Sequence, residues 1–283
     1  MSNIIQSFYS PICTTDWMFT HSCYFYLSSL YAHQSNIDIT LYTDYNFKEV
    51  LESAPYKEIN VLFNDYSQYN NINKLFWAWP KFIALDAVPR DTIHIDGDVF
   101  LKDNSCLRLL DIGEYDVMCQ HLEYKTYKDT IKTSYEDSFN AIKDFDYPEY
   151  IVKSIPESMP NNGVLCVQNE NLWNEYRDTY WKMLEQGEKI NEFPQGWCIP
   201  DIIFEQQFLK EICDYRGYSI KYILEGTSEN ELNIDAASKN YQHVCSDKKG
   251  KLQQCINLIR KKSNICYETL KYYWSKDYPE YFE

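Results

Sequence analysis

Glycine is scarce in this sequence, and long apolar runs are absent. The 283 residues include 8 glycines against 26 tyrosines, a composition that suggests packed elements with amphipathic surfaces. No stretch approaches the roughly 20 consecutive apolar residues that a helix needs to cross a bilayer. We find no internal repeat and no low-complexity linker. Because 45% of the residues are hydrophobic and 17% aromatic, the chain can bury a sizeable core, which argues against intrinsic disorder.

An excess of positive charge is also missing. The formal net charge is −15 and the sequence pI is about 4.8. Such a balance opposes any broad basic surface for a phosphate backbone, so we expect no nucleic-acid partner. A local basic pocket for a nucleotide diphosphate remains compatible with it.

The ten cysteines include no C-x-x-C pair, so a zinc ribbon or a thioredoxin-like centre is not supported. An even count could form a disulfide framework. However, the first ten residues, M-S-N-I-I-Q-S-F-Y-S, lack the basic start and long apolar stretch of a signal peptide. We therefore expect reduced thiols in a cytoplasmic protein.

The first half of the chain alternates strand-like and helix-like segments. We expect strands at residues 3–9, 37–43, 58–63 and 92–95, and helices at residues 15–33, 47–53 and 79–88. This rhythm, with its short connections, favours an α/β fold with a mostly parallel central sheet and helices on both faces.

The second half is less regular. Strands are expected at residues 116–121 and 162–167, and helices at residues 170–186 and from Pro200 onward. Residues 125–158 are polar and rich in tyrosine without a long periodic run, which predicts an insertion or a lid. We therefore divide the chain into one domain over residues 1–251 and a C-terminal helical, aromatic extension over residues 252–283.

The segment T-I-H-I-D-G-D-V-F, residues 92–100, places Asp96 and Asp98 in an otherwise apolar run. One interpretation is a turn, because aspartate and glycine are favoured turn residues. The other is a metal site at the carboxyl end of a buried strand, where an open parallel sheet binds its ligands. Both carboxylates could approach one hard cation, and Gly97 would let a ligand or backbone come close.

The chain resembles the GT-A glycosyltransferases, in particular the family 8-like group that uses nucleotide sugars and carries a D-x-D motif. The residues that carry the resemblance are W-A-W-P-K-F-I-A-L-D-A-V-P-R-D-T-I-H-I-D-G-D-V-F-L (77–101), N-N-G-V-L-C-V (161–167), P-D-I-I-F-E-Q-Q-F-L (200–209) and, more loosely, Y-Q-H-V-C-S-D-K-K-G-K (241–251). Their order and rough spacing agree over about residues 1–251. The resemblance implies a Rossmann-like GT-A sandwich.

The resemblance also implies a divalent cation, Mn²⁺ or Mg²⁺, that bridges the two phosphates of a nucleotide sugar. Asp96, Asp98 and His243 would bind it, and it would offset charge on the leaving diphosphate. Two features depart from the family pattern. The compact histidine–glycine–lysine signature is rearranged here, which places His243 in doubt as a ligand, and the doubled Asp-Gln-Asp is absent, which leaves the catalytic group open.

Each further residue that the resemblance implicates has a structural alternative. Asp201 or Glu205 would be the catalytic carboxylate, although Asp201 could simply cap its helix. Lys81 and Lys248 would contact phosphate, or lie on a helix surface and a solvated loop. Sugar hydroxyls would be bound by Asn161 and Asn162, or these residues would form a turn. The base and ribose would contact the strand ends at Tyr9, Ser10 and Asp44, where core packing is the alternative for Tyr9.

The sequence thus predicts a metal-dependent glycosyltransferase that transfers a hexose from a nucleoside diphosphate sugar, most simply a UDP-sugar, to a hydroxyl of a cell-surface glycan or glycolipid. Two alternatives are a nucleotidyltransferase and a non-catalytic sugar-binding relative of the same fold. The basic and apolar tail, residues 258–274, would allow a peripheral contact with the inner membrane face.

Overall fold

The structure is a computed structural model that describes residues 3–63, 76–124, 138–140, 142–151, 157–187, 200–244 and 248–283. The chain divides into two compact units. The first comprises Met1–Asn70, Ile93–Leu109 and Ala236–Glu283, and the second Asn71–Thr92 and Leu110–Asp235.

The central sheet has seven strands in the order β3-β2-β1-β4-β7-β6-β8. The pairings β1–β2, β1–β4, β2–β3 and β6–β8 are parallel, and β6–β7 is antiparallel. The predicted α/β class with a mostly parallel central sheet is therefore confirmed.

The first unit contains four of these strands, a separate two-stranded pair and the helices that cover them. The strands are β1 (Ile4–Ser7), β2 (Ile39–Thr43), β3 (Glu58–Val61), β4 (Ile93–Ile95), β5 (Val99–Leu101) and β9 (Tyr241–His243), and the α-helices are α1 (Thr15–Gln34), α2 (Tyr45–Val50), α9 (Leu252–Lys262) and α10 (Asn264–Trp274). Short 3₁₀ helices occupy Ser10–Ile12, Asn104–Arg108, Lys249–Lys251 and Pro279–Tyr281.

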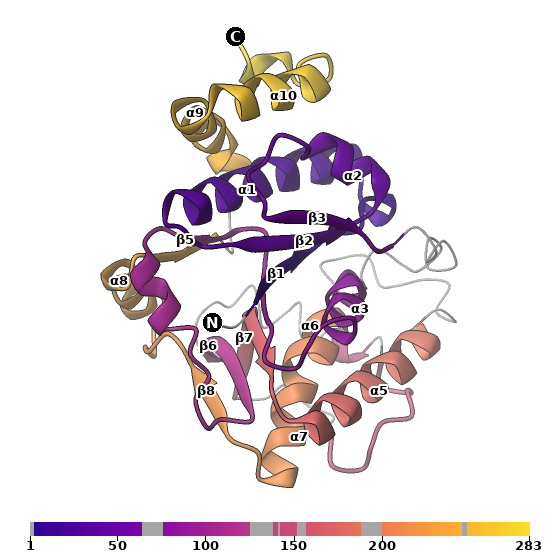
Figure 1. The fold of residues 1–283 in the computed structure, drawn as a ribbon. Helices are drawn as coiled ribbons and strands as arrows, with labels where there is room; N and C mark the ends of the chain where they lie inside the picture. The colour runs from indigo at the N-terminus through magenta and orange to yellow at the C-terminus, as the bar shows by residue number, and fades with distance from the viewer. Residues whose placement is uncertain are drawn as a thin grey trace. The chain divides into compact units, whose positions relative to one another are not determined.

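Helix α1 is the centre of the first unit's core. Thr14 caps it, because its side chain accepts a hydrogen bond from the Trp17 amide. Most of its residues from Phe19 onward are buried, since α9 and α10 pack along it, as Figure 1 shows. The predicted C-terminal extension, residues 252–283, therefore contributes to the same hydrophobic core as α1.

The second unit is built on an antiparallel hairpin-like pair with helices beside it. Its elements are β6 (Val117–Tyr124), β7 (Ser158–Val167), β8 (Ile220–Tyr222), α3 (Trp79–Asp86), α5 (Glu170–Gly187), α6 (Pro200–Ile202) and α7 (Phe208–Arg216). The unit also includes most of α8 (Glu229–Ser238), because its last stretch of sequence ends at Asp235. The rings of Phe82 on α3 and Tyr180 on α5 stack with centroids 3.8 Å apart, so α3 and α5 share one core.

The helix expected from Pro200 onward is not a uniform α-helix. A π-helix over Ile203–Gln207 separates α6 from α7. π-Helical turns inside α-helices are rare and occur frequently at functional sites. Glu205 lies in this turn.

Several predictions concern residues outside the described part. Most of the predicted insertion or lid, namely residues 125–137, 141 and 152–156, falls there, and so do Cys198 and Cys245.

Among the described cysteines, those that are buried, such as Cys23 and Cys255, are free thiols. Within the described ranges, no helix has the length and apolarity required to span a membrane.

Candidate functional site: a cation centre and a buried ion pair

The D-G-D segment is a turn between two strands of the first unit. β4 ends at Ile95, β5 begins at Val99, and the Val99 amide donates to the Asp96 carbonyl at 3.0 Å. A Cβ atom on Gly97 would lie 1.9 Å from the Phe25 ring. Glycine is therefore required here by the close approach of α1, and the turn interpretation describes the backbone correctly.

The side chains of this turn meet a residue from far along the sequence. β5 pairs with β9 so that Val99 is opposite His243, and the Val244 amide donates to the Asp98 carbonyl at 3.1 Å. This pairing places His243 Nε2 3.3 Å from Asp98 Oδ1. The turn and the metal interpretation are thus compatible, because the turn presents the carboxylates.

Asp98 is the most enclosed member of this group. It is 4% exposed, and its second oxygen, Oδ2, lies 2.8 Å from Lys248 Nζ. Burial alone would raise the pKa of the Asp98 carboxyl, but the Lys248 ammonium and His243 outweigh burial and hold that pKa well below its ordinary value. Asp98 is therefore an anion in the folded chain.

Asp96 is more open, with a side chain that is 34% exposed. Its Oδ1 lies 3.8 Å from His94 Nδ1, and His94 Nε2 lies 2.8 Å from Ser7 Oγ at the end of β1. His94 thus connects the aspartate turn to the neighbouring parallel strand.

Asp96, Asp98 and His243 form a donor set that fits a divalent cation. Each offers one ligand atom, and these atoms all lie within 4.8 Å of one another. Two carboxylates and one imidazole match the preferences of Mn²⁺, while Mg²⁺ would rely mainly on the carboxylates and water. The structure therefore brings together the three residues that the sequence predicted as ligands.

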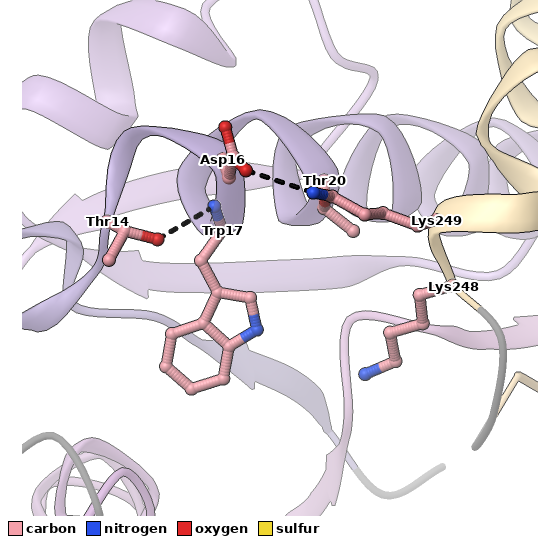
Figure 2. A pocket seen from close by; sticks show the side chains of 6 residues that line it. All are labelled: Thr14, Asp16, Trp17, Thr20, Lys248 and Lys249. Atoms are coloured by element: carbon pink, nitrogen blue, oxygen red, sulfur yellow. Dashed lines mark hydrogen bonds and ion pairs between the residues drawn. The ribbon is translucent and has the colours of Figure 1, made fainter.

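A pocket of about 190 Å³ adjoins this centre in the first unit. It is lined by Thr14, Asp16, Trp17, Thr20, Lys248 and Lys249 (Figure 2). Asp16 Oδ2 accepts a hydrogen bond from Lys249 Nζ at 3.0 Å. Lys248 belongs both to this pocket and to the cation centre, which makes it the residue that links them.

The predicted base and ribose residues form a compact polar contact at the ends of β1 and β2. Asp44 caps α2, and its carboxylate accepts hydrogen bonds from the Ser10 amide at 2.7 Å and the Ser10 hydroxyl at 2.8 Å. Tyr9 is 4% exposed and packs edge-on against Phe63. Asp44 and Ser10 thus fix the backbone at the ends of these two strands.

The remaining predicted residues gather in the second unit around a buried ion pair. Lys81 on α3 and Glu205 in the π-helix are joined by a hydrogen bond of 2.5 Å between Nζ and Oε1, with side chains 8% and 6% exposed. Lys81 Nζ also donates to the Asn162 carbonyl at 3.0 Å. The alternative of a surface lysine is therefore wrong for Lys81.

The π-helix gives Glu205 a second role. Its backbone carbonyl accepts hydrogen bonds from Asn162 Nδ2 at 2.8 Å and from the Tyr176 hydroxyl at 2.6 Å. A regular α-helix would use that carbonyl for its own ladder. The wider turn instead ties β7 and α5 to the helix that carries the acidic side chain.

Asp201 lies completely buried behind this pair. Its carboxylate accepts hydrogen bonds from the Ala78 amide at 2.5 Å and the Tyr180 hydroxyl at 2.9 Å. Burial raises the pKa of Asp201 to about 8, and the charge of Glu205 adds to this, while the hydrogen bonds oppose it. Asp201 therefore connects α6 to the start of α3 instead of capping its own helix.

Asn161 belongs to a polar group at the irregular end of the β6–β7 pair. Its Nδ2 donates to Glu123 Oε1 at 2.8 Å, and its Oδ1 accepts from the Gly163 amide at 2.9 Å. His121, opposite Asn161, lies 3.6 Å from Glu123, and the register shifts between Cys119 and His121. Sequence reasoning missed His121 and Glu123, because the strand predicted at residues 116–121 ends before Glu123, whereas β6 continues to Tyr124.

Comparison with known proteins places the chain in a family. A model described as a family of unknown function, DUF6734, matches residues 3–283. The chain belongs to this family. No curated protein matches it in sequence at a significant level.

The solved structures that are similar to the chain include two of LgtC. One is an active-site mutant, with a TM-score of 0.44, 10% identity and coverage of 90% of this chain and 95% of that chain. The other is galactosyltransferase LgtC in complex with donor and acceptor sugar analogs, with a TM-score of 0.44, 11% identity and coverage of 92% and 95%.

The phosphate contact predicted for Lys248 stays a prediction. The pairing of its ammonium with Asp98 is a contact that sequence reasoning missed. Half-buried His21 was missed as well: desolvation and Lys248 lower its pKa to about 3, and Asp98 and Asp96 oppose that shift. Neither neighbour relationship leaves a local signal in the sequence, because both depend on contacts with distant segments.

Proposed function

We propose that this chain is a divalent-cation-dependent glycosyltransferase that transfers a hexose from a nucleoside diphosphate sugar to a hydroxyl acceptor. The observation that carries the proposal is the convergence of Asp96, Asp98 and His243, two of them from one turn and the third from β9. The resemblance of the D-G-D segment to GT-A enzymes supports the same function, and a GT-A sandwich is part of the proposal.

In this proposal the chain's own residues hold and orient the donor. Asp96, Asp98 and His243 hold Mn²⁺ or Mg²⁺, which supplies Lewis-acid stabilisation of the leaving diphosphate when bound. The Lys248 ammonium adds positive charge beside the same phosphates. Ser10 and Asp44 shape the strand ends that receive the base and ribose, and Tyr9 supports them from the core.

For the second unit, we propose that its buried polar group contains the candidate catalytic carboxylates. Glu205, paired with Lys81, would stabilise positive charge on the sugar or accept the acceptor's proton. Asn161 and Asn162 would orient sugar hydroxyls. Asp201, which burial favours in its neutral form near neutral pH, would position the start of α3 that carries Lys81.

The acceptor in this proposal is a cell-surface glycan or glycolipid, reached by a peripheral contact at the inner face of the membrane. Basic residues in the last turn of α9, Arg260 to Lys262, and exposed Ile265 and Tyr272 on α10 support that contact. Co-sedimentation with anionic vesicles tests it, and a protein that stays in the supernatant with both anionic and neutral vesicles would refute it.

The first experiment is calorimetric titration of UDP, and then GDP, into the protein with Mn²⁺ and with EDTA. The proposal expects Mn²⁺-dependent binding of one nucleotide, loss of binding in Asp96→Asn/Asp98→Asn, and retention in Asp38→Asn, an aspartate of the same unit with a 75% exposed side chain. The single variant Asp96→Asn is the second test, because Asp96 is less buried and its loss perturbs the fold less.

The outcomes separate the proposal from its alternatives. Binding that survives EDTA unchanged would favour a non-catalytic sugar-binding relative, and no binding under any condition would overturn the donor site. If a nucleotide binds, hydrolysis of its sugar conjugates identifies the donor. A nucleotidyltransferase is disfavoured because the loop after β1, S-P-I-C-T-T-D over residues 10–16, has neither glycine nor arginine.

A further inference from the structure

The cation centre of the first unit already contains a positive charge supplied by the chain itself. Lys248 Nζ lies 2.8 Å from Asp98 Oδ2, while His243 lies against the other oxygen. A carboxylate as buried as Asp98 requires a counter-charge or hydrogen bonds to remain ionised. Lys248 therefore occupies, in the free chain, part of the electrostatic role that a divalent cation would take.

Lys248 combines an anchored backbone with a partly exposed side chain. Its carbonyl accepts a hydrogen bond from the Tyr24 hydroxyl at 2.9 Å, which holds the main chain at α1. Its side chain is 30% exposed and also lines the 190 Å³ pocket. Because four rotatable methylenes separate the ammonium from this anchor, the ammonium can leave Asp98 without movement of the backbone.

The pocket can receive the Lys248 ammonium once it has left Asp98, together with an anionic ligand. Figure 2 shows Lys248 and the Trp17 indole pointing to the same side of α1. Thr14 and Thr20 line this space, and Thr20 is 5% exposed. Asp16, the pocket's acidic residue, is already paired with Lys249, so its charge is compensated.

We propose that Lys248 is a tethered counter-ion that competes with the divalent cation for Asp98. The cation then binds tightly only when a phosphate-bearing ligand draws the Lys248 ammonium into the pocket lined by Thr14, Trp17 and Thr20. The physical reason is that two cations beside one buried carboxylate repel each other, whereas an anion in the pocket stabilises both. This inference rests on the proposed function for the presence of the cation, and it adds an order of binding: the anionic ligand precedes or accompanies the cation.

The test is titration of the full chain with Mn²⁺. Calorimetry and the electron paramagnetic resonance signal of free Mn²⁺ measure the binding. Lys248→Gln keeps a hydrogen-bond donor for Asp98 but removes the charge, and it is expected to bind Mn²⁺ at least about tenfold more tightly than the wild type. Lys57→Met, which removes an exposed lysine of the same unit that pairs with Asp38, is the matched control and keeps the wild-type affinity for Mn²⁺. Lys248→Arg keeps the charge and binds as weakly as the wild type.

A second arm tests the coupling to the anion. Inorganic phosphate is expected to raise the Mn²⁺ affinity of the wild type severalfold, after correction for the phosphate complex in solution, and to raise that of Lys248→Gln much less. An equal rise in both would overturn the coupling. Lys248→Met is the second variant: without Mn²⁺ its melting temperature falls because Asp98 loses its counter-charge, and Mn²⁺ raises it by more than in the wild type.

Failure of this inference can be told apart from failure of the proposed function. If the wild type binds Mn²⁺ and neither Lys248→Gln nor Lys248→Met binds it more tightly, only the competition is refuted. If no form of the chain binds Mn²⁺, with or without phosphate, the cation centre itself is refuted, and the proposed function fails with it.

Discussion

Val99 and His243 are register partners in the β5–β9 pair, although the chain between them passes through most of the second unit. This single pairing turns a local D-G-D turn into a three-residue donor set. It also brings His243 beside the two aspartates, although the spacing around this histidine departs from the family signature that the sequence resembles.

The contribution of His243 can be measured directly. His243→Ala is expected to lower the Mn²⁺ affinity at least about tenfold, because one of three protein donors is lost and water replaces it. Electron paramagnetic resonance of free Mn²⁺ measures the affinity. His33→Ala, in the last turn of α1 at an exposed position, is the control and should bind as the wild type does. Equal affinities for all three forms would exclude His243 from the centre.

Gly97 is expected to tolerate no side chain. In Gly97→Ala the new methyl group would overlap the Phe25 ring, so the turn must shift; we expect a loss of about 1–3 kcal/mol in the free energy of unfolding and weaker Mn²⁺ binding. Urea unfolding and Mn²⁺ titration measure the two effects.

The matched control for this prediction is Gly113→Ala. Gly113 has a φ of +62° with nothing within 4 Å of a built Cβ, so its substitution costs about 1–2 kcal/mol through backbone strain and leaves Mn²⁺ affinity unchanged. Unaltered Mn²⁺ affinity in Gly97→Ala would show that the turn geometry is not needed for the donor set.

The buried pair of Lys81 and Glu205 predicts a non-additive mutational effect. Lys81→Met leaves the Glu205 carboxylate buried without its counter-charge and is expected to cost about 3–5 kcal/mol of stability. The double variant Lys81→Met/Glu205→Gln should recover much of this loss, because no buried charge remains. Urea unfolding of the single and double variants gives the coupling free energy.

Lys57→Met is the control for that cycle. Lys57 forms an exposed ion pair with Asp38, with side chains 58% and 75% exposed, and its loss should change stability by less than about 1 kcal/mol. If Lys81→Met cost as little as Lys57→Met, the pair would not be buried as the structure shows.

The raised pKa of Asp201 predicts that the free energy of unfolding falls as the pH rises. Its pKa rises from the ordinary value of 3.8 to about 8 in the folded chain, so the folded state binds this proton more tightly than the unfolded state does. The contribution is fully present below about pH 4 and is lost as the pH rises towards 8, by up to about 1.4 kcal/mol per pH unit.

Urea unfolding between pH 4 and 9 tests this dependence. Asp201→Asn is expected to remove it, so that the difference in stability between wild type and variant shrinks or changes sign as the pH rises. Asp38→Asn keeps the wild-type slope. Parallel curves for wild type and Asp201→Asn would contradict the raised pKa.

The sequence predicted the elements whose patterns are local. The helix over residues 15–33 contains the largely apolar stretch S-C-Y-F-Y-L-S-S-L-Y-A, and it appears as Thr15–Gln34. The strand at residues 37–43 alternates with period two and appears as Ile39–Thr43. Short β5, β8 and β9, of three residues each, carry too few residues for any period to be visible, so they were not predicted.

Sequence reasoning singled out candidate site residues whose chemistry stands out locally. It missed relationships between residues that only tertiary contacts bring together. Asp96 and Asp98 stand out because charge interrupts an apolar run. Asp201 and Glu205 are four residues apart, which in a regular α-helix would place them on one face, but the π-helix changes their spacing around the axis and gives them different partners. A wider turn of this kind is stabilised by Asn162 and Tyr176 from other elements, which a local pattern does not contain.

The division of the first unit into three separate stretches of sequence has a consequence for how the chain matures. A nascent chain that has emerged through α1 still lacks β9, Lys248 and the two C-terminal helices that cover α1. The apolar surface of α1 therefore stays uncovered until residues 236–283 have been made, and only these residues bring His243 and Lys248 to the carboxylates of the D-G-D turn. The donor set of the proposed cation centre is thus completed late, and binding of Mn²⁺ by fragments of increasing length would report when this unit has folded.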